Sequence, residues 1–157
     1  MPPTVRTCAV LFVIAGCFGA ADDVEVTVSR ALAFEPLGRG RQALLDSTER
    51  VIKDAAEWEA LNDSLRPILR LGQVDFELEM VMLAAVPVPT GGYDLRFEVI
   101  DETADGLTAG YRVFVPGADC RTTLGEGVVF QAIRLARTNA PVTFVKETET
   151  LRCTEPG

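Results

Sequence analysis

The second half of the chain is a succession of short strand-like segments separated by turn residues, and this pattern restricts the fold more than any other feature. After Val74, apolar residues first alternate with acids and then run uninterrupted to Val86, as in a strand that becomes buried on both faces. Asp105-Gly106 supplies a hairpin turn, and Gly125 and Gly127 place a loop before the next segment. The strands predicted in this half are Val74–Val86, Tyr93–Ile100, Leu107–Val115, Val128–Leu135 and Pro141–Glu147.

The first half contributes two more strands and one helix. Val24–Ser29 alternates valine with acidic or hydroxyl residues, Arg50–Lys53 is a short second strand, and residues 31–41, with their proline and glycines, are predicted as a loop. Asp54 and Glu57 have the spacing of a capping box, which predicts a helix over Ala55–Leu65. Its core-facing stripe consists of Trp58, Leu61 and Leu65.

These elements predict a mainly β fold. We expect an antiparallel sandwich or barrel of about seven strands that carries one short helix.

Three acids in the first strand of the second half raise the question of catalysis. Asp75, Glu77 and Glu79 fall on one predicted strand face, and paired carboxylates are what a glycosidase uses as acid and as nucleophile or base. Strict alternation with apolar residues is also typical of a solvated strand surface. We expect the solvated surface, with the other face directed to the core through Phe76, Leu78 and Met80.

Residues 1–21 have the order of features of an export signal. Arg6 is followed by the apolar run Cys8–Ala15 and then by small residues. The run is shorter than the about 20 residues of a permanent membrane helix. Ile14–Cys17 resembles a bacterial lipobox, which would make Cys17 the acylated first residue, whereas cleavage near Ala21 would release a soluble protein. We expect residues 22–157 to form a single β-rich domain, and the alternative, a hydrophobic first strand of a cytosolic protein, fits the order of features less well.

The cysteine count agrees with export. Either cleavage leaves only Cys120 and Cys153 in the folded part, in an oxidising compartment where pairing is the expected state. We predict a disulfide between them, the alternative being two buried free thiols.

Charge and composition exclude several function classes. The net charge is −8, from 15 basic against 23 acidic side chains, so nucleic acid is not an expected partner. Histidine is absent, which removes histidine-based nucleophile systems and zinc sites. A calcium-loop pattern over Asp101–Asp105 fails because its twelfth position is Arg112. We expect no metal, no cofactor and no enzymatic activity, and membrane contact only through a lipid on Cys17.

One connector has the composition of a recognition loop. Prolines, two adjacent glycines and an aromatic residue combine rigid edges with a compliant centre, a shape suited to a partner's groove. The alternative is an ordinary connector whose Tyr93 packs inward. The partner-binding residues predicted here are Pro89, Thr90, Gly91, Gly92 and Tyr93.

The chain also resembles a known family over roughly residues 50–147. Val51-Ile52, Asp54–Trp58, Val74–Val81 and Pro89–Tyr93, in this order and spacing, are similar to the PrcB C-terminal-domain family of exported bacterial proteins. The resemblance implies a small β-rich domain, often on a lipoprotein, in a family named for a component that stabilises a surface protease complex. Thr90–Tyr93 is also loosely similar to the loop that chagasin-type cysteine protease inhibitors wedge into an active-site cleft.

Together these observations predict an exported, non-catalytic protein-binding module of the cell envelope, periplasm or medium. We expect a protein partner, such as a secreted protease, bound or stabilised through Pro89–Tyr93. The alternative is a structural envelope lipoprotein in which this segment only joins two strands.

Overall fold

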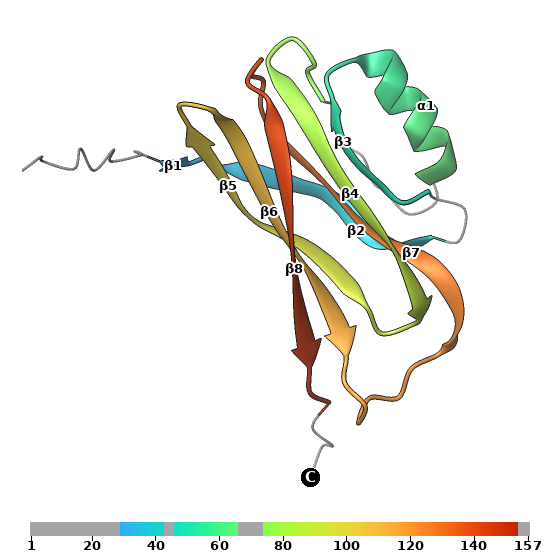
Figure 1. Cartoon of the computed structure of the whole chain (residues 1–157). Helices are drawn as coiled ribbons and strands as arrows, with labels where there is room; N and C mark the ends of the chain where they lie inside the picture. The colour runs from blue at the N-terminus through green and yellow to red at the C-terminus, as the bar shows by residue number, and fades with distance from the viewer. Residues whose placement is uncertain (1–28, 43–45, 66–73, 154–157) are drawn as a thin grey trace, which may run out of the picture.

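The computed structural model describes residues 29–42, 46–65 and 74–153, which form two facing four-stranded sheets with one helix against the outer side of the second sheet (Figure 1). The prediction of a mainly β, sandwich-like fold with one short helix is confirmed, with eight strands among the described residues in place of about seven. The export signal of residues 1–21, Cys17 and nearly all of the predicted strand Val24–Ser29 lie outside the described residues.

Sheet A has the strand order β1-β5-β6-β8 and is not entirely antiparallel. β6 and β8 run parallel, because the chain leaves β6, crosses to the other sheet as β7, and returns in the direction of β6. The prediction of an antiparallel sandwich or barrel is therefore wrong for this pair. A hairpin joins β5 and β6 as expected, but its turn residues are Ala104 and Asp105 rather than Asp105 and Gly106, because Gly106 already pairs with Thr103. The strands are β1 (Arg30–Ala31), β5 (Asp94–Thr103), β6 (Gly106–Pro116) and β8 (Val142–Leu151).

Sheet B has the order β2-β7-β4-β3, and two of its strands correct the sequence prediction. The segment predicted as a loop over 31–41 is mostly β2, and its Pro36 is tolerated because β2 is an edge strand with an irregularity between Pro36 and Gly38. Gly125 and Gly127 lie inside β7 rather than in a loop before it. The strands are β2 (Phe34–Gln42), β7 (Leu124–Ala136), β4 (Glu79–Thr90) and β3 (Thr48–Ile52).

The helix α1 (Ala55–Leu65) has the predicted bounds. Asp54 caps it, because its Oδ1 accepts hydrogen bonds from the backbone N–H groups of Ala56 at 2.8 Å and Glu57 at 3.1 Å. Trp58 packs onto the outer face of sheet B and forms an outer core with buried side chains of three strands. These side chains are Ile52, Val81, Leu83, Ala85, Val128, Phe130 and Ala132.

A turn replaces the start of the strand predicted from Val74. The side chain of Asp75 accepts a hydrogen bond from the N–H of Glu77 at 3.0 Å, and its carbonyl accepts one from the N–H of Glu79 at 2.7 Å. β4 therefore begins only at Glu79, and the three acids do not share a strand face. Leu78, predicted to face the core, is 71% exposed. The sequence of this segment alternates as in a strand, but the side chain of Asp75 bonds to the backbone within the segment, and the resulting Asx turn forms in place of the strand.

The inner core lies between the two sheets and contains one buried amide. Gln131 of β7 is only 5% exposed, and its Oε1 accepts a hydrogen bond from the N–H of Phe97 across the sandwich at 2.5 Å. Phe97 stands where the β5–β6 register shifts, between Phe97 and Val99. A side chain from one sheet thus pairs with the irregular backbone of the other.

Gln131→Leu is expected to lower the free energy of unfolding by about 1–3 kcal/mol, because the N–H of Phe97 would remain buried without this acceptor. Urea unfolding at 25 °C measures the change. Thr143→Leu, on the exposed outer face of sheet A, is the control and is expected to shift stability by less than about 0.5 kcal/mol. A Gln131→Leu variant as stable as the wild type would contradict this role.

Candidate functional site: the tip of the sandwich

The candidate site is one end of the sandwich, here called the tip, formed by Pro89–Tyr93 and residues 116–124. Pro89 and Thr90 end β4 of sheet B, and residues 91–93 carry the chain from there to β5 of sheet A. Residues 117–123 carry it from β6 back to β7 (Figure 1). Both connections therefore cross between the sheets at the same end. The five predicted partner-binding residues lie within this tip.

The glycines of the tip are held against the second connection. The N–H of Gly91 donates a hydrogen bond to the carbonyl of Thr123 at 2.8 Å. Gly91 is buried, and a Cβ at this position would stand 2.1 Å from Thr123 Oγ1. Gly92 is exposed and has a φ of 86°, in the region that favours glycine. Position 92 therefore favours glycine because of its backbone conformation, whereas a side chain at position 91 would first require Thr123 to change its rotamer.

The tip presents apolar surface to solvent. Leu124, which pairs with Thr90 in the β4–β7 ladder, is 95% exposed, the highest value among the large exposed apolar side chains that the structure describes. Pro89 and Gly92 are also exposed. Tyr93 is half-buried and packs against the inner core. Sequence reasoning missed Leu124, because Gly125 and Gly127 predict a loop before Val128 and give no reason to single out the residue that precedes it.

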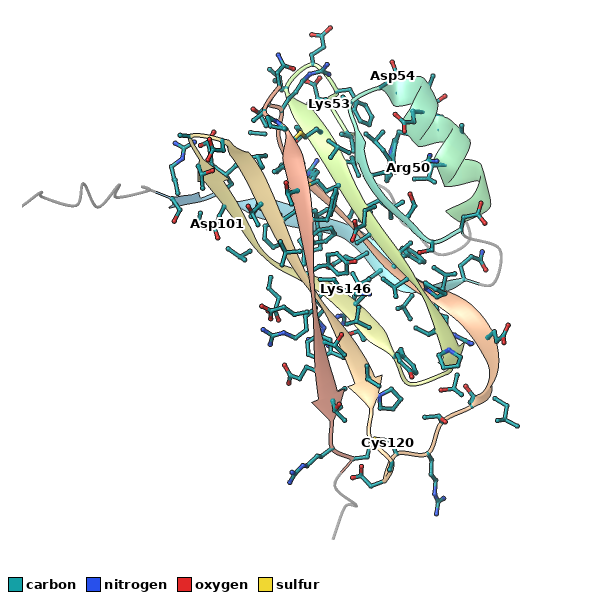
Figure 2. The ribbon with its side chains drawn as sticks, in the orientation of Figure 1. Arg50, Lys53, Asp54, Asp101, Cys120 and Lys146 are labelled. Carbon is teal, nitrogen blue, oxygen red and sulfur yellow. A yellow bond between two sulfur atoms is a disulfide. The ribbon has the colours of Figure 1, made fainter. Side chains whose placement is uncertain are left out.

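The predicted disulfide is confirmed and fastens the tip to the last strand. Cys120 and Cys153 are bonded, with 5.1 Å between their Cα atoms. Nearby, the N–H of Gly117 donates to the carbonyl of Leu151 at 2.9 Å, and the N–H of Cys120 donates to the carbonyl of Gly117 at 3.0 Å. The labelled Cys120 marks this end of the molecule in Figure 2. The connection that holds Gly91 is therefore itself anchored to the end of β8.

A groove of about 500 Å³ adjoins the tip on sheet B. It is lined by residues of β4 and of the adjacent strand β7, namely Pro87, Val88, Pro89, Glu126, Gly127 and Val128. The guanidinium of Arg41 donates to the carbonyl of Gly125 beside it. The groove combines apolar walls with one carboxylate and extends the exposed apolar surface around Pro89.

A second polar contact lies between the sheets, away from the tip. The hydroxyl of Tyr111 donates to Glu49 Oε1 at 2.6 Å, joining β6 of sheet A to β3 of sheet B. Burial, together with this hydrogen bond and the negative charge of Glu49, raises the pKa of Tyr111 well above its usual range. The phenol thus stays protonated and serves as a donor between the sheets.

The described residues contain neither a metal-binding cluster nor a helix able to span a membrane. No three His, Cys, Asp or Glu side chains within residues 29–42, 46–65 and 74–153 are grouped so that they could hold a metal ion. Over the same residues, the single helix is too short and too polar to cross a membrane.

Comparison of the whole chain with known proteins yielded no relative. No protein-family model, no curated protein and no solved structure matches it.

Proposed function

We propose that this protein is an exported, non-catalytic binding module that holds a partner protein through the tip of its sandwich. The observation that carries the proposal is Leu124, which is 95% exposed directly beside the fixed Gly91-Gly92 turn. A large apolar side chain on a held backbone is the kind of anchor that fills a pocket in a partner. Loops at one end of a β-sandwich are a recurrent place for such recognition.

The rigidity of the tip supports binding rather than mere connection. The Gly91–Thr123 hydrogen bond and the Cys120–Cys153 bond limit the conformations of both connections before any partner arrives. A partner then orders few additional residues, which lowers the entropic cost of association. Burying a leucine side chain contributes about 1.5–3 kcal/mol. That energy corresponds to an affinity change of about tenfold or more.

The partner proposed is a protein, and within the resemblance to the PrcB C-terminal-domain family it is a secreted protease or its complex. The net charge of −8 favours a partner with a basic rim and an association that weakens with salt. The module would act in the envelope, anchored through Cys17, or free in the periplasm or medium. Nucleic acid is not proposed as a partner.

Leu124→Asp is expected to weaken partner binding at least about tenfold while the melting temperature changes little, because the side chain is exposed. Wild type and variant would be crosslinked in parallel in native envelopes, and the captured protein would then be purified and titrated with each. Leu78→Asp is the matched control, since Leu78 is also exposed but lies immediately before the first residue of β4, at the end of the strand opposite to the tip. A strand of 12 residues puts roughly 40 Å between the two sites.

Equal binding of wild type and Leu124→Asp would contradict the proposed role of the tip. The same outcome would favour the second candidate, a structural envelope lipoprotein, which has one observation on its side. Tyr93 packs against the inner core, as the residue of an ordinary connector would. A captured partner lost with Leu124→Asp and retained with Leu78→Asp would exclude that candidate.

A further inference from the structure

A second surface, independent of the tip, lies along β8. β8 is the last strand of sheet A, and within the part of the chain that the structure describes no strand pairs with its far side. All its residues except Val142 and Phe144 are exposed. In a parallel ladder, alternate residues of an edge strand direct their N–H and C=O groups away from the sheet. The β8 edge, residues Val142–Leu151, therefore offers unused backbone donors and acceptors.

The outer face of this edge carries excess negative charge. Arg112 of β6 contacts Glu98 at 2.7 Å, Glu147 at 3.0 Å and Glu149 at 2.7 Å. One guanidinium thus faces three carboxylates, and two of them, Glu147 and Glu149, project from β8 itself. An added strand with lysine or arginine at alternate positions would complete this charge pattern.

The same glutamates disfavour a second copy of this chain. Pairing of β8 with its own copy across their free edges would bring the acidic side chains of the two strands opposite or diagonal to one another. Like charges at such positions destabilise a sheet. The charges that exclude self-association are those that select a basic strand.

The inner side of the edge adds a pocket. A cleft of about 560 Å³ opens between β8 and β3, the neighbouring edges of the two sheets. Its walls include Thr48, Glu49, Tyr111 and Lys146. Glu49 is occupied by the hydroxyl of Tyr111, whereas Lys146, labelled midway along β8 in Figure 2, has no hydrogen bond or ion pair with any described residue. Lys146 therefore lines the cleft without an ion-pair partner among the described residues, on the opposite face of β8 from the glutamates, while the charged carboxylate of Glu49 lines the same cleft.

We propose that the β8 edge accepts an extended segment of a partner protein as an added strand of sheet A. Main-chain hydrogen bonds supply the attachment, and side chains at alternate positions supply the specificity. The segment carries basic residues on the face of Glu147 and Glu149. On the other face it carries an acidic residue, which enters the cleft beside Lys146.

The test uses a labelled ten-residue peptide with lysine at alternate positions, valine at the others and one central glutamate in place of valine. Fluorescence anisotropy with the full chain is expected to show saturable binding that weakens with salt. Amide hydrogen exchange in residues 142–151 is expected to slow on binding. The double variant Glu147→Lys with Glu149→Lys is expected to bind at least tenfold more weakly. Its matched control is Glu59→Lys with Glu77→Lys, which makes the same charge change on α1 and in the Asp75 turn.

Backbone N-methylation of the peptide separates strand addition from simple charge attraction and leaves the protein unaltered. Methyl groups on alternate residues remove the donors along one edge of the peptide, and two peptides cover its two edges. One of them is expected to lose binding and the other to keep it. Equal binding by both would overturn the proposal, as would a dimer in sedimentation that protects β8 from exchange. Leu124→Asp is expected to bind the peptide normally, which keeps this test distinct from that of the tip.

Discussion

Trp58→Ala is expected to lower the free energy of unfolding by about 3–5 kcal/mol. Trp58 is only 5% exposed and is the aromatic residue through which α1 packs onto sheet B. Its removal would leave a cavity over Val81, Leu83 and Phe130, whose side chains pack in the same outer core. Because α1 is short, few neighbouring side chains could move in to fill this cavity.

Urea unfolding followed by far-ultraviolet circular dichroism measures this change. Glu59→Ala on the same helix is the control, because Glu59 is exposed and its replacement is expected to shift stability by less than about 0.5 kcal/mol. A helix of 11 residues is marginally stable on its own in water, so most of the stability of α1 comes from its packing against sheet B. A Trp58→Ala variant within 1 kcal/mol of the wild type would show that α1 contributes little to the fold.

The helix was predictable to the residue because its signals are local. The capping side chain of Asp54 and the apolar spacing that begins at Trp58 lie within one short stretch of sequence. The disulfide was predictable for a different reason, since removal of the export signal predicted over residues 1–21 would leave Cys120 only Cys153 as a partner. In both cases few alternatives compete with the observed structure.

Other elements could not be predicted because distant residues decide them. β2 looks like a loop, and it becomes a strand because β7 offers a complete edge for it to pair with. The Asp75 segment looks like a strand and instead forms a turn through hydrogen bonds within the segment itself. The parallel pairing of β6 with β8 depends on the passage of β7 through the other sheet, which no local pattern encodes.

The candidate site was predictable only in part for the same physical reason. Two prolines and two glycines around Thr90 mark the connector, but the hydrogen bond that holds Gly91 comes from the carbonyl of Thr123, more than thirty residues along the chain. The exposure of Leu124 depends on where β7 begins relative to Thr90. Composition therefore points to Pro89–Tyr93, whereas residues 116–124 become part of the tip only through the topology of the sandwich.

Replacing both cysteines, Cys120→Ser with Cys153→Ser, is expected to lower the free energy of unfolding by about 3.5–4 kcal/mol in the chain from residue 22 onward, which has no other cysteine. The bond closes a loop with a sequence separation of 33 residues, and its loss frees the denatured chain to adopt many more conformations. Guanidinium unfolding of the wild type with and without reductant, and of the double variant, measures the effect.

Reductant supplies the internal control for this change. It should lower the stability of the wild type to that of the double variant and should leave the double variant unaltered. The folded state should also respond locally, because the bond anchors the connection whose Thr123 carbonyl accepts from Gly91. Amide exchange at Gly91 is therefore expected to accelerate more than exchange at Phe130 in the outer core. A stability loss below 1 kcal/mol, with Gly91 exchange unaltered, would contradict the view that the disulfide fixes the tip. The tip would then have to become ordered when the partner binds, and the entropic cost of this ordering would lower the affinity.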